Sequence, residues 1–114
     1  MDEPSIFTKI IEREIPADIV FEDDRVIAIR DINPQAPVHL LVIPKNPSFA
    51  TVSEVAAADP GLLSHLVGVA AKLADEHADG QFRLVFNSGE NAGQTVFHVH
   101  GHVLAGGLAE GSLA

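Results

Sequence analysis

Apolar residues recur at helical spacing in two parts of the chain. Near the N-terminus, Ser5 can cap a short amphipathic helix predicted over residues 6–14, and Pro16 ends it. The second pattern is longer and predicts a helix over residues 60–79, because its broad apolar stripe begins after Asp59 with a proline in the first turn. We therefore expect two helices of unequal length.

Five further segments have the composition or the alternation of β-strands. They cover residues 19–22, 25–30, 38–44, 82–87 and 96–104. Asp23 and Asp24 separate the first two and predict a two-residue hairpin. The unbroken apolar run at 40–43 predicts a central strand buried on both faces.

The order of these elements, α-β-β-β-α-β-β, predicts the fold class. It indicates an α+β fold with a five-stranded antiparallel sheet, a short N-terminal helix and one long helix, the helices covering one face of the sheet. We expect a single domain over residues 1–114, in which residues 105–114 form a loose tail.

The composition agrees with one compact domain and argues against some classes of binding partner. The chain has 114 residues, of which 46% are hydrophobic, and a chain of this length buries roughly two-thirds of its unfolded surface. Sixteen acidic and seven basic residues give a net charge of -9, which argues against a DNA or RNA polymer as partner. A small nucleotide stays possible, because local donors can hold one phosphate against an unfavourable overall field.

Two absences in the sequence exclude further classes. Without cysteine, the chain can form no disulfide, thiolate nucleophile or cysteine-based zinc motif. The first residues are acidic where a signal peptide is basic, and no apolar run reaches the ~20 residues of a membrane span. We expect a soluble, cytoplasmic protein that makes no membrane contact.

Three histidines alternate along the last predicted strand. His98, His100 and His102 would point to the same side of that strand and lie ~6.6 Å apart. The residues on the opposite side, which would face the core, are Phe97, Val99, Gly101 and Val103. The pattern therefore predicts a row of imidazoles on one face of the sheet.

Such a row has three interpretations. It can be a solvated polar face, a zinc or copper site built on neutral imidazoles, or a site of covalent or acid–base catalysis at phosphorus. A metal site lacks an evident fourth ligand in the sequence. The preceding loop, residues 88–95, favours phosphorus chemistry, because its backbone and hydroxyl groups can donate hydrogen bonds to phosphate oxygens, although it is not a Walker loop. Crowded imidazoles also lower one another's pKa, which keeps a nucleophile unprotonated near neutral pH.

The segment from His98 to Leu104 resembles the signature of the histidine triad family, in which three histidines alternate with apolar residues. Four other segments are similar to the histidine triad nucleotide-binding (Hint) branch of that family. They are Ser5–Ile11, Phe21–Arg25, Asp31–His39 and Leu41–Lys45. The matches follow one another in order from about Ser5 to Gly107, so the resemblance covers most of the chain.

The resemblance implies a homodimer whose two sheets join edge to edge. It also implies a purine nucleoside phosphoramidase or nucleotidyl hydrolase, acting on adenosine 5′-phosphoramidates or acyl-AMP, that needs no metal or other cofactor. His100 would be the nucleophile that forms a nucleotidyl-imidazole intermediate, His102 would contact the leaving group, and His98 and His39 would support the nucleophile.

The same resemblance implies a nucleotide site. Asp31 would hold the two ribose hydroxyls, which suits a carboxylate with two acceptor oxygens. The residues that would line the phosphate and the leaving group are Asn87, Gly93, Gln94 and Thr95. Those that would wall the base pocket are Phe7, Ile10, Ile29 and Ile32.

Simpler interpretations stay open at several of these positions. By itself, Asp31 is typical of a turn before Asn33 and Pro34, and His39 within an apolar strand is typical of a buried histidine with satisfied hydrogen bonds. Phe7, Ile10 and Ile32 are ordinary core candidates. For the whole chain, the alternative function is a nucleotide-binding scaffold or regulatory protein without significant turnover.

Three departures from the family pattern affect these expectations. Gly101 stands where the pattern has an apolar side chain, so we expect the opposite face of the strand to be less filled. Ile29 stands where relatives often have an aromatic residue, which predicts weaker base stacking. The tail lacks a tryptophan-containing segment with which many relatives reach toward the partner's site. Of the properties that the resemblance implies, the preference for a leaving group therefore carries over to this chain least well.

Overall fold

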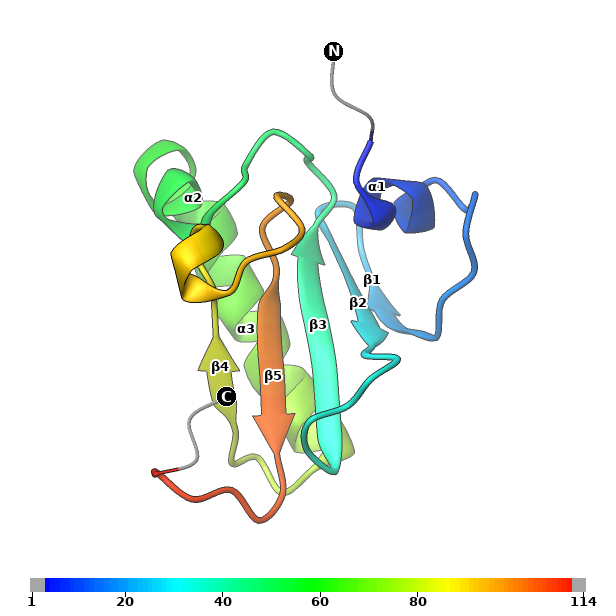
Figure 1. The fold of residues 1–114 in the computed structure, drawn as a ribbon. Coiled ribbons are helices and arrows are strands. Elements are labelled where there is room, and N and C mark those ends of the chain that lie inside the picture. The colour runs from blue at the N-terminus through cyan, green and yellow to red at the C-terminus, as the bar shows by residue number, and fades with distance from the viewer. Residues whose placement is uncertain (1–3, 112–114) are drawn as a thin grey trace.

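The fold is an α+β domain with one five-stranded antiparallel sheet, as predicted (Figure 1). It is seen in a computed structural model that describes residues 4–111. The elements are α1 (Ile6–Ile11), β1 (Ile19–Glu22), β2 (Val26–Arg30), β3 (Val38–Pro44), α2 (Val52–Ala58), α3 (Pro60–His77), β4 (Arg83–Val85), the 3-10 turn η1 (Glu90–Ala92) and β5 (Gly101–Ala105). The strand order is β1-β2-β3-β5-β4, so β3 is central, as the apolar run at 40–43 predicts.

Helices cover both faces of the sheet, and the prediction that all of them share one face is wrong. Successive residues of β2 and β3 point to opposite faces and pack into two separate clusters. One cluster contains Leu40, Val42, the buried residue of α2 and most of the buried residues of α3, whereas the other contains Leu41, Ile43 and the two buried residues of α1. In Figure 1, α3 accordingly lies behind the sheet and α1 on the other side. The open front face beside α1 is where a site can form.

The long helix begins where the sequence predicts. Asp59 caps it by accepting a hydrogen bond from the N–H of Leu62, and Pro60 occupies the first turn. Its His65 extends toward the turn after β1, where the His65 Nε2 lies 2.6 Å from the Asp23 Oδ2. This contact ties α3 to the end of the β1–β2 hairpin.

The sequence analysis did not predict α2. Thr51 caps this helix by accepting from the N–H of Glu54, and the Glu54 carboxylate accepts from the N–H of Ala50 over 2.8 Å. The pattern Thr51-x-x-Glu54 is the usual start of a capped helix, so the signal was present. Only Val55 of α2 is buried, which leaves too short an apolar stripe to reveal the helix.

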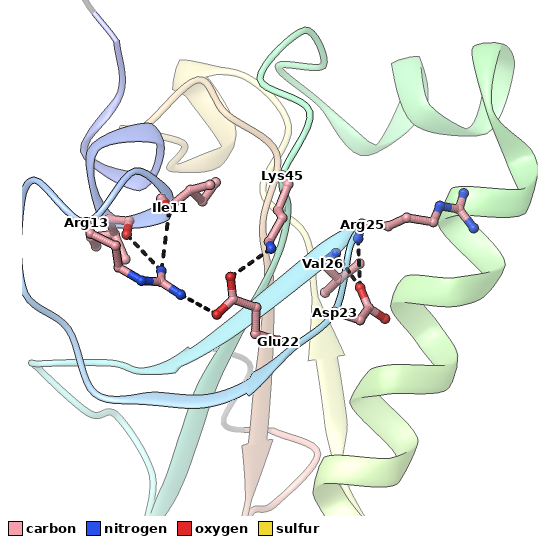
Figure 2. A network of polar contacts seen from close by, with 8 residues as sticks. Ile11, Arg13, Glu22, Asp23, Arg25, Val26 and Lys45 are labelled. Carbon is pink, nitrogen blue, oxygen red and sulfur yellow. Dashed lines mark hydrogen bonds and ion pairs between the residues drawn. The ribbon is translucent and has the colours of Figure 1, made fainter.

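The first helix is shorter than predicted, because it ends at Ile11 and not near Glu14. Arg13 adopts a left-handed backbone with φ of 65°, and its guanidinium donates to the carbonyl groups of Ile10 and Ile11. The same guanidinium pairs with Glu22 on β1, whose other oxygen lies 2.7 Å from the Lys45 Nζ (Figure 2). The two cations hold the pKa of Glu22 below its usual value, with Lys45 the larger cause. This network fastens the end of α1 to the sheet.

The histidine segment is not one continuous strand. Because β5 begins at Gly101, the predicted strand 96–104 is wrong over its first half, and His102 is the one triad histidine that lies on a strand. Before β5, the chain turns to the loop after β3, where the Val99 N–H donates to the Phe49 carbonyl over 2.9 Å. Val99 is buried as predicted, but Phe97 is half exposed.

Three smaller boundaries also differ from the prediction. β4 is limited to Arg83–Val85. Ala105 pairs with Val38 and ends β5, so it does not belong to a loose tail. Residues 23–25 separate β1 from β2, and the Asp23 N–H donates to the Val26 carbonyl over 2.9 Å, so the two inner residues of the turn are Asp24 and Arg25 and not Asp23 and Asp24. Residues 112–114 of the predicted tail lie outside the described residues.

Within residues 4–111, no helix is both long and apolar enough to cross a membrane.

The space beside Gly101 is filled, contrary to the expectation of a less filled face. A Cβ at this position would lie 2.9 Å from the Phe86 Cζ and 3.1 Å from the Leu84 Cδ1. Both side chains pack against the core cluster that contains Val99 and Val103. Gly101 thus allows a close approach of the aromatic ring to the strand.

We expect Gly101→Ala to destabilise the protein by about 1–3 kcal/mol, the usual cost of adding a methyl group to a packed core. Chemical denaturation measures this difference. Gly68→Ala is the matched control: it lies on the exposed side of α3 with nothing within 4 Å, and we expect it to stabilise by about 0.5–1 kcal/mol. A Gly101→Ala protein as stable as the wild type would contradict the packing described for Phe86.

Candidate active site

Four histidine side chains meet on the face of the sheet that bears α1. His39 comes from β3, His102 from β5, and His98 and His100 from the segment before β5. The ring centroids of His100 and His102 lie 5.2 Å apart, as do those of His39 and His102. The structure therefore brings together the four predicted catalytic residues, although the predicted continuous strand does not carry them.

The protonation of His100 follows from a backbone contact. Its Nδ1 lies 2.9 Å from the carbonyl oxygen of His98. A carbonyl oxygen can only accept, so the proton of the neutral ring is on Nδ1 and the lone pair is on Nε2. Burial is the main cause that lowers the pKa of His100, so the ring is neutral near pH 7. An unprotonated Nε2 is the form of histidine that can attack phosphorus.

His102 is the opposite tautomer of His100, with its proton on Nε2 and its lone pair on Nδ1. The N–H of Gln35 donates to the His39 Nδ1 over 3.0 Å, so the proton of neutral His39 is on its Nε2. That Nε2–H donates to the His102 Nδ1 over 2.9 Å, which leaves the His102 proton on Nε2. Burial, followed by the nearby His100 and His39 rings, lowers the pKa of His102 to about 4. Two adjacent neutral rings thus offer a lone pair and an N–H donor.

One group of these side chains has the composition of a metal site. The possible ligand atoms of Asp31, His39 and His102 lie within 4.8 Å of one another. A metal ion on the His39 Nε2 would need the lone pair there, which would move the proton to Nδ1 and break the bond from the Gln35 N–H. The donor set therefore fits a hydrogen-bond chain better than a metal ion.

Asp31 makes the turn contact that its sequence position predicts and also lies beside the histidine cluster. Its Oδ1 accepts from the N–H of Asn33 over 2.8 Å, which is the expected turn contact. Its Oδ2 lies 3.4 Å from the His39 Nε2, at the edge of the histidine cluster. The carboxylate is partly buried, so one oxygen shapes the turn while the other stays beside the site.

The loop before the histidines is held in place by a buried glutamine. The amide of Gln94 accepts from the N–H of Gly89 over 2.8 Å and donates to the carbonyls of Ala50 and Val96 over 2.6 and 3.0 Å. Its side chain is therefore fully used in organising the loop. Gly93 and Thr95 on either side are exposed, and Gly93 has a φ of 93° that favours glycine. Asn87 follows β4, two residues after the partner of His102 in the sheet.

Three of the four predicted base-pocket residues lie together. Phe7, Ile10 and Ile29 are buried in the cluster beneath α1. The Phe7 ring meets the ring of His100 edge to face, with centroids 4.8 Å apart. Ile32, in contrast, is 98% exposed on the loop after β2. An exposed apolar side chain beside the Asp31 turn is free to contact a ligand.

Sequence reasoning missed three polar groups that face the histidines. They are the Ser5 hydroxyl, the Thr8 hydroxyl and the Gln35 N–H. Ser5 was predicted as a helix cap, which it is, but its second contact could not be read from the spacing. An open depression of about 790 Å³ lies beside Ser5 and Thr8, and of the predicted site residues only His98 and Thr95 line it.

The chain is similar to known proteins over most of its length. Residues 4–112 match the family model described as scavenger mRNA decapping enzyme C-term binding. The chain is 48% identical over 108 residues to the purine nucleoside phosphoramidase of Escherichia coli, covering 93% of this chain and 90% of that protein.

Solved structures show the same fold. A HIT family hydrolase from Clostridium thermocellum aligns with a TM-score of 0.85 and 47% identity, covering 93% of both chains. A histidine triad nucleotide-binding protein from Candida albicans aligns with a TM-score of 0.77 and 32% identity, covering 87% of this chain and 72% of that one.

The low pKa of His102 predicts a loss of stability in mild acid. In the unfolded chain the ring takes up its proton near pH 6.5, whereas in the folded protein it does so only at about 4. Between these values the unfolded state binds more protons, so the free energy of unfolding falls as the pH falls. Because the ring is partly exposed, solvent screening reduces the effect, and we expect His102→Asn to remove on the order of 2 kcal/mol of the fall in unfolding free energy between pH 6.5 and pH 4.

Urea denaturation at a series of pH values measures this difference. An asparagine oxygen can still accept from His39, so the substitution removes the titration with little change in shape. His77→Asn, at the end of α3 and outside the histidine cluster, is the matched control for replacing a histidine by asparagine. Equal slopes for the wild type and His102→Asn would show that the ring does not titrate as described.

Proposed function

Because the chain belongs to the histidine triad (HIT) family, we propose that it hydrolyses purine nucleoside 5′-phosphoramidates or acyl-nucleotides through a covalent nucleotidyl-histidine intermediate. The observation that supports this most directly is the pair of opposite tautomers. His100 presents a lone pair and His102 presents an N–H, on rings whose centroids are 5.2 Å apart. The named activity of the E. coli relative is of the same kind.

In the first step, the His100 Nε2 attacks the phosphorus atom. The new N–P bond forms while the bond from phosphorus to the leaving group breaks. A leaving amine departs with a proton taken up from water, and the His102 Nε2–H stabilises it by a hydrogen bond. The positive charge that develops on His100 is stabilised because its Nδ1–H stays bonded to the His98 carbonyl.

In the second step, water attacks the phosphorus atom of the intermediate. The N–P bond breaks, the nucleoside monophosphate leaves, and the water gives up one proton to solvent. His100 returns to the neutral form with its lone pair on Nε2. The two steps use no metal or other cofactor.

We assign the nucleotide contacts from the family resemblance and from the positions described above. Asp31 would bind the ribose through the oxygen that does not make the turn. The base would lie against the side chains of Phe7, Ile10, Ile29 and Ile32, and the phosphate against Asn87, Gly93 and Thr95. Because the Gln94 amide is committed to loop contacts, we assign it the role of holding that loop.

We expect His100→Ala to abolish turnover while AMP still binds, because binding is spread over several groups but the covalent step needs one imidazole. The assay is hydrolysis of an adenosine phosphoramidate by the wild type and the variant, with AMP affinity measured by calorimetry. Wild-type turnover should persist in a chelator. No turnover by the wild type would favour the nucleotide-binding scaffold, and a variant within tenfold of the wild type would refute the role of His100.

We expect Asp31→Asn to weaken AMP binding by about 1.5–3 kcal/mol, the range for hydrogen bonds to a charged group. The asparagine oxygen can still accept from Asn33, so the turn is kept and the test isolates the ribose contact. The 2′-deoxy analogue should bind the wild type with a comparable loss. Unchanged affinity in both comparisons would leave Asp31 with the turn alone.

We also propose that the protein forms a homodimer in which two sheets join edge to edge. The described sheet has two outer strands, β1 and β4, that can accept a further strand. Light scattering should therefore give twice the chain mass of 12.1 kDa at micromolar concentration, and the monomer mass would contradict the proposal. The cytoplasmic location is also a prediction, which cell fractionation would check.

A further inference from the structure

His98 is a buried ring whose two nitrogens are both bonded. Its side chain is 1% exposed, and its Nε2 donates to the carbonyl oxygen of Pro44 over 2.7 Å. The carbonyl cannot donate, so the neutral ring has its lone pair on Nδ1. A buried lone pair of this kind needs a donor, because an unsatisfied acceptor costs free energy.

The donor is Ser5, the residue that caps the N-terminal helix. The Ser5 Oγ lies 2.9 Å from the His98 Nδ1, whereas the Thr8 Oγ1 is 3.4 Å away. The Ser5 oxygen also accepts from the N–H of Thr8 over 3.1 Å, which is its capping contact. One hydroxyl therefore caps α1 with its lone pair and holds His98 with its proton.

The effect on the nucleophile passes through the backbone of His98. The carbonyl oxygen of this residue is the acceptor that keeps the His100 proton on Nδ1. Rotation or protonation of the His98 ring would shift this carbonyl or place a charge beside His100. Among the titratable groups, His100 is the one whose charge acts on His98. The other ring against His98 is Phe7 of α1, which is apolar.

We propose that Ser5 is a positioning residue for the nucleophile: by donating its hydroxyl proton to His98, it keeps that ring neutral and keeps the His98 carbonyl in place for His100. The inference rests on the proposed function, because it assigns a role in the covalent step. Its consequence is that α1, which brings Phe7 and Ile10 to the base pocket, also controls the chemical step.

Three substitutions of Ser5 separate this role from capping. Ser5→Thr keeps both the acceptor and the donor. Ser5→Asp keeps the cap, because a carboxylate accepts well at this position, but it has no proton to donate. Ser5→Ala removes both. Thr51→Ala is the matched control, because it removes the cap of α2, which lies on the other side of the sheet.

The measurements are kcat for an adenosine phosphoramidate, the affinity for AMP, and the ring state of His98 from nitrogen-15 NMR of the histidine side chains. For Ser5→Asp we expect a doubly protonated His98 near neutral pH, AMP affinity close to the wild type, and a fall in kcat of about a hundred-fold, the order expected for a misplaced reacting group. Ser5→Ala should lower kcat by about tenfold, since water from the adjacent depression can replace part of the contact. Ser5→Thr should restore wild-type kcat, and Thr51→Ala should keep it.

The outcomes are distinguishable from failure of the proposed function. If the wild type shows no turnover, the function is wrong, but the ring state of His98 in Ser5→Asp still tests the contact. A neutral His98 in Ser5→Asp, or a Ser5→Asp protein with wild-type kcat, would overturn the proposal. So would a Ser5→Ala protein that loses AMP affinity by the same factor as kcat, because that result describes a helix needed only for binding.

Discussion

The site depends on hydrogen bonds between imidazole rings and backbone groups that can only donate or only accept. A carbonyl oxygen only accepts and an N–H only donates, so the carbonyls of His98 and Pro44 and the N–H of Gln35 each determine one tautomer. If the His98 carbonyl moved, the His100 proton would no longer be fixed on Nδ1, and the proposed nucleophile would lose its defined lone pair on Nε2. Every buried side-chain nitrogen and oxygen in the described residues has a partner, which is consistent with a network that has one stable arrangement.

The central strand and the loop after it supply several members of this network. β3 supplies His39 and Pro44, lies between β2 and β5, and is buried on both faces. The loop after it supplies the Phe49 and Ala50 carbonyls, which receive the Val99 N–H and the Gln94 amide. The histidine segment leaves the sheet before His102 because this loop, and not a strand, is its neighbour. Because the segment leaves the sheet, His98 is buried in the protein, whereas His100 remains partly exposed on the face that bears α1.

Much of the fold could be predicted from the sequence, because hydrophobic period and capping residues act locally. The central strand follows from the apolar run at 40–43, and the start of α3 follows from Asp59 and Pro60. The end of α1 could not be predicted, because it depends on Arg13 reaching Glu22 on a strand that comes later in the chain. Likewise, spacing alone identified His98, His100 and His102, but their proton positions depend on partners far away in sequence. The role of Ser5 was missed for the same reason, since its contact with His98 joins residues 93 positions apart.

The shortness of α1 has a consequence for ligand binding. A helix of six residues is not stable alone, because the cost of nucleation exceeds the gain from so few hydrogen bonds. It is held by its two buried side chains, by Ser5 at one end and by the Arg13–Glu22–Lys45 network at the other. Local opening of this helix would remove the proposed base pocket and the Ser5 contact to His98 together, so under the proposed function the open state would neither hold a nucleotide nor react with one. If the proposed site is correct, a bound nucleotide would stabilise α1 by mass action, and the closed population of this one helix would set the fraction of molecules that are competent to turn over.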